Sequence, residues 1–154
     1  MPELKSTLRV LNEADVDSKP GEHPGQTGKR LVGNDERPSE RLYVGLTSIN
    51  SGAKAPLHWH IVEGLYYVIS GRAVMRDIEG RSHEIGPGSA IYTPPGIEGS
   101  HSWDIKERLQ LVAIRATTDP AKLIQFRVDE STKESAIELA RLIKHGATKF
   151  KSFY

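Results

Sequence analysis

Short apolar runs separated by turn residues occupy the chain from residue 41 to residue 115. The runs are rich in Val, Ile, Leu and Tyr, and Gly, Pro or Asn stands between them at short and regular spacing. In chain order they read RLYVGLTSI, GLYYVIS, RAVMRDI, SAIYT and LQLVAIR. This rhythm predicts antiparallel β-strands, and its regularity favours a sandwich or a barrel.

Tight reversals are predicted at four points between these runs. Glycine accepts a positive φ angle at little cost and proline fixes φ, so both residues favour tight turns. Such residues occur at Asn50-Ser51-Gly52, Ser70-Gly71, Glu79-Gly80 and Gly86-Pro87-Gly88. We therefore expect the chain to turn back at each of these places.

The two ends of the chain follow other patterns. Residues 18–38 are rich in Gly, Pro, Lys and Asp apart from a short KRLV segment, which predicts an irregular arm on the outside of the domain. Near the other end, Ser131 and Glu134 form a capping box, and apolar residues then recur at helical spacing at Ala136, Leu139, Ala140 and Ile143. We expect one amphipathic helix, which covers an open face or edge of the barrel or contributes to a dimer contact.

Composition limits the function further. With 154 residues, 37% hydrophobic and 27% charged, the chain fits one domain, which we divide into an arm (1–40), a barrel (41–128) and a helix with a tail (129–154). The net charge of +1 gives no reason to expect nucleic acid or a membrane surface as a partner. Neither a secretion signal nor an apolar stretch of roughly 18 residues occurs, so we expect a cytoplasmic protein with a small-molecule partner.

Two histidines one residue apart give the strongest chemical signal. His58 and His60 lie in the segment GAKAPLHWHIVEGLYYVISG, on a predicted strand. Side chains alternate along a strand with a period of two, so both histidines point to the same face and can bind one metal ion together. Trp59 between them faces the other way, where we expect it to pack. Because the chain has no cysteine, histidines and carboxylates are left to bind the metal.

Around this pair the sequence resembles the cupin superfamily. The first cupin motif contains a glycine, two histidines one residue apart, a glutamate and a second glycine, and the second motif contains a glycine, a proline and a glycine before a third histidine. The matching residues, between about residues 52 and 103, are Gly52, His58, His60 and Gly71, then Gly88, Pro94 and Gly96. The resemblance implies an all-β cupin double-stranded β-helix, a jelly-roll barrel. To this we add the irregular N-terminal arm and one C-terminal α-helix.

The third histidine and the glutamate depart from the family motifs. The histidine position falls on Gly99, and the nearest histidine is His101, two residues later. A shift of two keeps the strand parity, so we take His101 as the third ligand. The glutamate position falls on Gly64. We expect a site of three neutral histidines with open coordination positions. Two carboxylates stay as alternatives to the missing glutamate: Glu63, which could reach the metal through a bulge, and Glu98, in the longer turn before His101.

A site of three histidines leaves the metal its full positive charge and favours anionic, chelating substrates. The resemblance here is to the three-histidine, iron-dependent β-diketone-cleaving and thiol dioxygenases, which implies Fe(II), with Zn, Ni, Mn or Cu as alternatives. Two residues are catalytic candidates. Tyr66 shares the inward parity of Gly64, and Arg76 stands in the apolar run RAVMRDI, either facing a substrate carboxylate or enolate or pointing outward at the surface.

Three functions follow from these residues. The first is an Fe(II) dioxygenase acting on a small chelating oxygenated substrate. The second is a metal-assisted lyase or isomerase in which an inward group such as Tyr66 moves a proton. The third is a small-molecule-binding protein without turnover, because a fold does not determine a function. The resemblance also implies a homodimer, formed through an edge strand or an exchanged arm.

Overall fold

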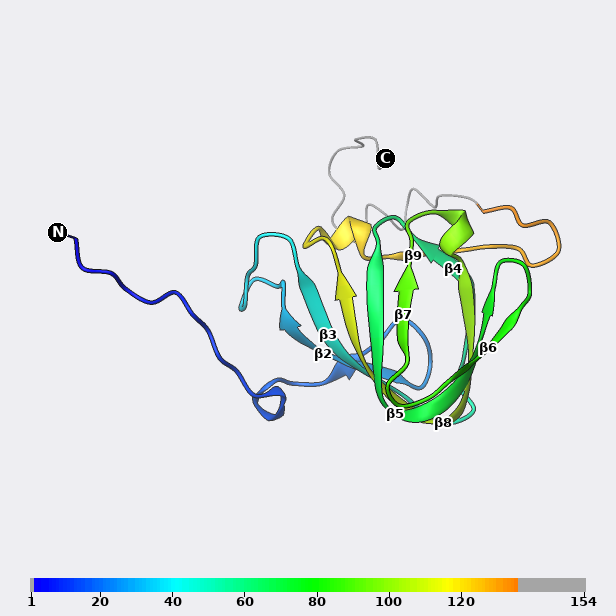
Figure 1. The fold of residues 1–154 in the computed structure, drawn as a ribbon, viewed down its shortest axis with the longest axis horizontal. Helices are drawn as coiled ribbons and strands as arrows, with labels where there is room; N and C mark the ends of the chain where they lie inside the picture. Colours follow the sequence, from blue (N-terminus) through cyan, green and yellow to red (C-terminus); the bar gives the residue numbers. More distant parts are fainter. Residues whose placement is uncertain (1, 136–154) are drawn as a thin grey trace.

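The computed structural model describes residues 2–135, and these residues form nine strands and three short 3-10 helices (Figure 1). The strands are β1 (Lys19–Pro20), β2 (Gln26–Val32), β3 (Tyr43–Ile49), β4 (Lys54–His60), β5 (Gly64–Asp77), β6 (Ser82–Ile85), β7 (Ala90–Thr93), β8 (His101–Arg115) and β9 (Gln125–Arg127). The 3-10 helices are η1 (Glu13–Asp15), η2 (Ile97–Gly99) and η3 (Pro120–Lys122).

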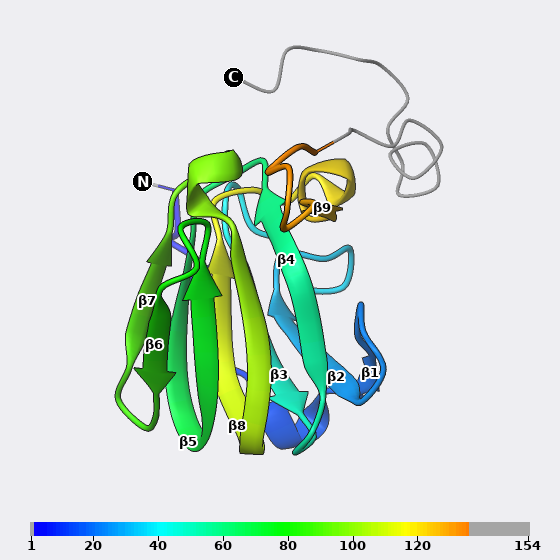
Figure 2. The same ribbon diagram turned by 90° about the vertical axis from the view of Figure 1, so that its right-hand side faces the viewer.

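The long strand β8 is the centre of the sheet. It pairs with β4 near its beginning, with β3 near its end and with β5 along its whole length, and every strand pairing is antiparallel. The sheet curls round on itself, so that β5, β6 and β7 lie on one side of the molecule and β2, β3 and β4 on the other (Figure 2). The predicted all-β, barrel-like fold is confirmed.

Both β5 and β8 are strongly bent. A straight strand of 15 residues would be roughly 45 Å long. Yet His101 and Arg115, at opposite ends of β8, both lie next to His60, since the His60 and His101 ring centroids are 5.7 Å apart and Arg115 Nη2 is 3.0 Å from His60 Nε2. Figure 1 shows the two strands turning together at the bottom of the barrel. The bend therefore brings both ends of β8 to the same mouth.

Gly71 lies at this bend. It has a φ of 90°, and the pairing of β5 with β8 shifts register around it, between Val68 and Ala73. A Cβ at this position would lie 2.1 Å from the carbonyl oxygen of Arg108 on β8. The predicted reversal at Ser70-Gly71 is therefore wrong: the glycine permits a close crossing of two continuous strands instead of a turn.

The other three predicted turns are present. Positive φ angles occur at Gly52, before β4, at Gly80, between β5 and β6, and at Gly88, between β6 and β7. In each case the glycine joins consecutive strands, as its sequence context predicts.

Alternation along the strands creates an interior and a second apolar layer. Inside the barrel, Tyr66 and Val68 of β5 pack with residues of β8, including Trp103 and Leu111. On the opposite side of β4, Trp59 packs against Phe126 of β9, with ring centroids 5.0 Å apart. The segment after β8 thus covers the back of β4, and the packing role expected for Trp59 is confirmed.

The chain ends differ in part from the expectations. Residues 26–32, placed in the irregular arm, form β2 and pair with β3, because the outer edge of β3 offers unpaired backbone groups. At the other end, the capping box of Ser131 and Glu134 does not form within the described residues. Asp129 instead accepts hydrogen bonds from the backbone N–H groups of Ser131 and Thr132 and closes a turn. The remainder of the predicted helix, from residue 136, lies outside the described residues.

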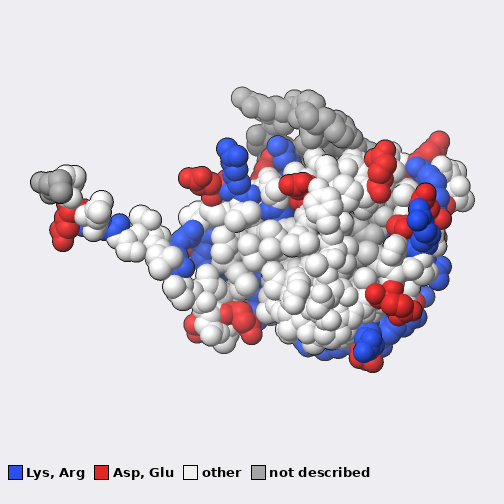
Figure 3. Space-filling view, viewed as in Figure 1, with Lys and Arg blue, Asp and Glu red and all other residues white. Residues whose placement is uncertain are grey.

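One outer face of the barrel has few charged side chains. Figure 3 shows a broad surface over β5 and β7 with few charged side chains, and the large apolar residues exposed there are Leu65, Tyr67, Ile69 and Tyr92. Such a face commonly marks an interaction surface, and the homodimer stays a prediction that substitutions here would test. Within residues 2–135, no helix has the length and apolar character needed to cross a membrane.

The close crossing at Gly71 predicts a large loss of stability in Gly71→Ala. Gly80→Ala is the matched control, because Gly80 has a similar φ of 83° but nothing within 4 Å of a Cβ. The control should lose about 1 kcal/mol, the cost of a left-handed conformation for alanine. Gly71→Ala should lose about 2 kcal/mol more through overlap with the backbone of β8. Urea unfolding of both variants measures the difference, and equal losses would contradict this role of Gly71.

Candidate metal centre

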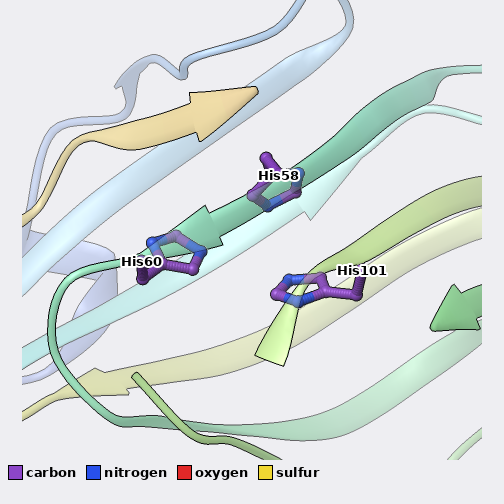
Figure 4. Close-up of side chains that lie close together, drawn as sticks. All are labelled: His58, His60 and His101. Carbon is purple, nitrogen blue, oxygen red and sulfur yellow. The ribbon is translucent and has the colours of Figure 1, made fainter. Parts of the chain in front are cut away.

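Three buried histidines meet inside the barrel, as Figure 4 shows. His58 and His60 lie at the end of β4 and point inward on the same face, as the period of two predicts. His101 is the first residue of β8 and is paired in register with His58. Each of the three histidines is no more than 4% exposed. The sheet therefore brings together the three histidines that the sequence singles out.

The nitrogen atoms are close enough to share one ion. One ring nitrogen from each histidine lies within 4.8 Å of the other two. The ring centroids of His58 and His101 are 4.5 Å apart, and those of His58 and His60 are 5.2 Å apart. Imidazole nitrogens suit zinc, iron, nickel and copper, so this cluster can hold a divalent metal ion.

The hydrogen bonds of His58 and His101 fit metal binding. In each ring Nδ1 contacts a backbone carbonyl oxygen, Pro56 O at 2.7 Å for His58 and Gly99 O at 3.0 Å for His101. A carbonyl only accepts, so Nδ1 carries the proton and Nε2 has the lone pair. Both Nε2 atoms are buried and have no hydrogen-bond partner among the described residues. Metal-binding histidines have this same support on the nitrogen away from the metal.

His60 has a different environment. Its Nε2 lies 3.0 Å from Nη2 of Arg115 and 3.4 Å from the hydroxyl of Tyr66, and its Nδ1 is buried without a partner in the described part of the chain. A guanidinium group only donates, so Nε2 offers its lone pair to Arg115 and the proton stays on Nδ1. Neither nitrogen of His60 can bind a metal while this contact persists. Metal and Arg115 therefore compete for one lone pair.

All three histidines are held in the neutral form. Burial lowers the pKa of His58 and His60 well below the ordinary value, and the charge of Arg115 adds to the effect at His60. Burial also lowers the pKa of His101 to about 4. At neutral pH the rings are therefore unprotonated, which is the form that binds metals.

No carboxylate joins the histidines among the described residues. Glu63, the first alternative, is exposed and accepts a hydrogen bond from the hydroxyl of Tyr92 at 2.8 Å. Glu98, the second alternative, is also exposed. Glu63 and Gly64 therefore face opposite sides of the sheet, as neighbouring strand residues do, and Gly64 is the one that faces the interior. The leading expectation of a site with three histidines agrees with this geometry.

Arg115 is a residue of the site that the sequence reasoning missed. It is 4% exposed, and its Nη1 donates to Thr93 Oγ1 at 3.0 Å. A Cβ at position 64 would lie 1.5 Å from Nη1, so only glycine there leaves room for the guanidinium. Parity along LQLVAIR could have found it, because Leu109, Leu111, Ala113 and Arg115 share the inward face. A charged residue at the end of an inward-facing row was the signal.

The two catalytic candidates lie in different places. Tyr66 is buried beside the cluster, with its ring 5.8 Å from that of His101 between centroids, and it accepts a hydrogen bond from Arg115 at its hydroxyl. Arg76 is exposed on the outer face of β5, near Asp104. The structure thus brings Tyr66 to the histidines. It leaves Arg76 at the surface, which is the second of the two positions considered for that arginine.

The cluster opens into a cleft of about 760 Å³ inside the barrel. Apolar side chains such as Trp103 and Leu111 line its depth, and residues of the N-terminal arm line its rim. His23 from this arm contacts Gln125 through Nε2 at 2.7 Å, and its ring centroid is 6.0 Å from that of His58. A small molecule can therefore reach His58 and His60 from the side of the arm.

Comparisons with known proteins agree with this barrel. A family profile described as a cupin domain matches residues 45–115. No curated protein sequence matches the chain. Among solved structures, the chain is similar to the polyketide cyclase RemF from Streptomyces resistomycificus, with 20% identity, a TM-score of 0.68 and coverage of 82% of this chain and 89% of that chain.

Two further structures share the fold. One is a sugar phosphate isomerase of the cupin superfamily from Silicibacter pomeroyi, with 22% identity, a TM-score of 0.59 and coverage of 72% of this chain and 77% of that chain. The other is a salicylate 1,2-dioxygenase from Pseudoaminobacter salicylatoxidans, with 16% identity and a TM-score of 0.52. The match covers 60% of this chain and 25% of that chain. The names of these proteins span different reactions, so the likeness establishes a fold and no single activity.

The geometry of the cluster predicts that His101→Ala weakens metal binding by at least about 100-fold, since loss of a ligand exceeds the 10- to 100-fold typical of its supporting groups. The matched control is His83→Ala, which removes an exposed histidine bonded to Asp77. Metal content after dialysis and calorimetric titration with Zn²⁺ measure both variants beside the wild type. Unchanged stoichiometry and affinity in His101→Ala would show that the third ligand lies elsewhere.

Proposed function

We propose that this chain, whose residues 45–115 match the cupin domain, is a metal-dependent enzyme acting on a small, anionic, chelating organic substrate that contains oxygen. One observation carries the proposal. The Nε2 atoms of His58 and His101 are buried, and their lone pairs have no partner among the described residues. Backbone carbonyl groups orient both histidine rings by accepting hydrogen bonds from Nδ1. A buried polar atom without a partner is costly unless a ligand satisfies it.

The charge of the site supports the choice of an anionic substrate. Three neutral histidines leave a divalent metal with its full charge, and the guanidinium of Arg115 adds another positive charge beside His60. Buried charge of one sign is stable only when opposite charge or hydrogen bonds compensate it. A carboxylate or an enolate with a second oxygen supplies this compensation.

The first reaction within this proposal is an Fe(II)-dependent dioxygenation. Fe(II), when bound, supplies open positions at which a chelating substrate and dioxygen come together. The chain's own residues provide the rest: the histidines hold the ion, and Trp103 and Leu111 give the cleft an apolar part against which the substrate can pack. The three-histidine set resembles that of iron-dependent cupin dioxygenases, and the shared fold with a salicylate 1,2-dioxygenase is consistent with this reaction.

A second reaction, a metal-assisted lyase or isomerase, is favoured by the position of Tyr66. Arg115 donates to the hydroxyl oxygen of Tyr66, so the hydroxyl proton can point toward His60 Nε2, 3.4 Å away, or toward a substrate. A buried O–H group beside the metal site is suited to moving a proton to or from an enolate. The similar structures with cyclase and isomerase names are consistent with this chemistry.

Oxygen dependence separates the two reactions. We expect the Fe(II)-loaded protein to consume oxygen in step with substrate loss on a panel of diketones and small hydroxy acids, and the Zn²⁺-loaded protein to consume none. Tyr66→Phe should keep the metal content and, if a proton is moved by this hydroxyl, lower turnover by the 100-fold or more typical of a lost acid or base. An oxygen electrode and product analysis measure these rates.

Each result has a clear meaning. Substrate loss without oxygen, with Zn²⁺ as well as with Fe(II), would replace the dioxygenase by the lyase or isomerase. Saturable substrate binding without any product would replace both by a binding function. A protein that binds no divalent metal would overturn the proposal itself.

A further inference from the structure

Arg115 is a buried cation without a carboxylate partner in the described part of the chain. Its three hydrogen bonds go to Thr93 Oγ1, His60 Nε2 and the hydroxyl of Tyr66, all of them neutral groups. The ion pairs found among residues 2–135 do not include it. A buried guanidinium is normally paired with an anion, because neutral acceptors compensate only part of the lost hydration.

Neighbouring residues fix the position of the guanidinium. Gly64 leaves the space that it occupies, since a Cβ there would lie 1.5 Å from Nη1 and 2.6 Å from Cζ. Thr93 accepts from Nη1 and donates its own proton to the carbonyl of Gly64 at 3.3 Å. The Cζ atom also lies 4.7 Å from the centroid of the Tyr66 ring. The arginine is therefore held in one place before any ligand binds, which favours binding.

Gly64 also falls on the glutamate position of the first cupin motif described above. A glutamate at this position would place a negative charge beside the histidines. Here the glycine admits the guanidinium of Arg115, so the same region contributes a positive charge. The substitution reverses the sign of the charge beside the cluster, and the site lacks the anion that the glutamate would provide.

We propose that Arg115 forms an anion subsite next to the three histidines, and that it binds the carboxylate of a small organic acid with an apolar body. The cleft includes Arg115 and, beside it, Tyr66, and its lining also contains Trp103 and Leu111, which suit an apolar or aromatic body. A guanidinium has five N–H donors and the contacts above use three of them, so it can bind a carboxylate in addition. The subsite extends the proposed function, because it names the part of the substrate recognised away from the metal.

Benzoate tests the subsite without any metal. Wild-type protein freed of metal is titrated with benzoate and, as the neutral ligand of the same shape, with benzamide, by calorimetry at low ionic strength. We expect benzoate to bind more tightly than benzamide by at least about 10-fold, the usual value of a charge-assisted hydrogen bond. Arg115→Gln should abolish this preference. Arg108→Gln, which removes an exposed arginine from the same strand, should keep it.

Two measurements keep the test decisive if Arg115→Gln does not fold. Arg115→Lys keeps the positive charge without the planar fork, so it should retain part of the preference for benzoate. In the wild type alone, benzoate should raise the melting temperature more than benzamide does at the same concentration. Equal binding of the two ligands to the wild type would overturn the subsite.

This result is independent of the metal. A preference for benzoate in a protein that binds no metal would keep the subsite and overturn the proposed enzyme. Metal binding with no preference for benzoate would keep the enzyme and overturn the subsite. If Arg115→Gln still preferred benzoate, another positively charged residue would bind the carboxylate, and the role of Arg115 would be overturned.

Discussion

The site depends on the bend that β5 and β8 share at Gly71. These strands pair along their length, so neither can bend without the other, and the crossing is close enough that a Cβ on Gly71 would overlap the backbone of β8. The bend brings both His101, at the beginning of β8, and Arg115, at its end, next to His60. Residues 14 positions apart on one strand thereby become neighbours, which a straight strand forbids.

The bend alone would place a buried cation beside a metal site, and Gly64 decides how that cation is accommodated. A side chain larger than hydrogen at this position would displace the guanidinium, whereas the glycine lets it rest against Thr93 and Tyr66. Burial and the nearby positive charge then lower the pKa of His60. The contact with Arg115 thus helps to keep His60 neutral, while it also occupies the lone pair that a metal ion would need.

The sequence predicted those parts of the site that depend on local parity. His58 and His60 share a face because they are two residues apart, and His101 kept its parity across the longer turn before β8. Arg115 was missed because its importance comes from the bend, which depends on how β5 and β8 pair. Gly71 was predicted as a reversal for the same reason, since a positive φ serves a bulge as well as a turn. The strand β2 was missed because only pairing with β3 orders its polar residues.

The contact between His60 and Arg115 links the two halves of the site. His60 has one lone pair, and in this structure Arg115 uses it. A metal ion needs the same lone pair, so metal binding removes one acceptor from a guanidinium that already lacks an anion. The need of Arg115 for a carboxylate is therefore greatest when the metal is present. By the reciprocity of coupled equilibria, a metal ion at His60 and a carboxylate on Arg115 would then strengthen each other's binding to the same extent. A substrate that spans both points would thus complete a site whose parts compete when it is absent.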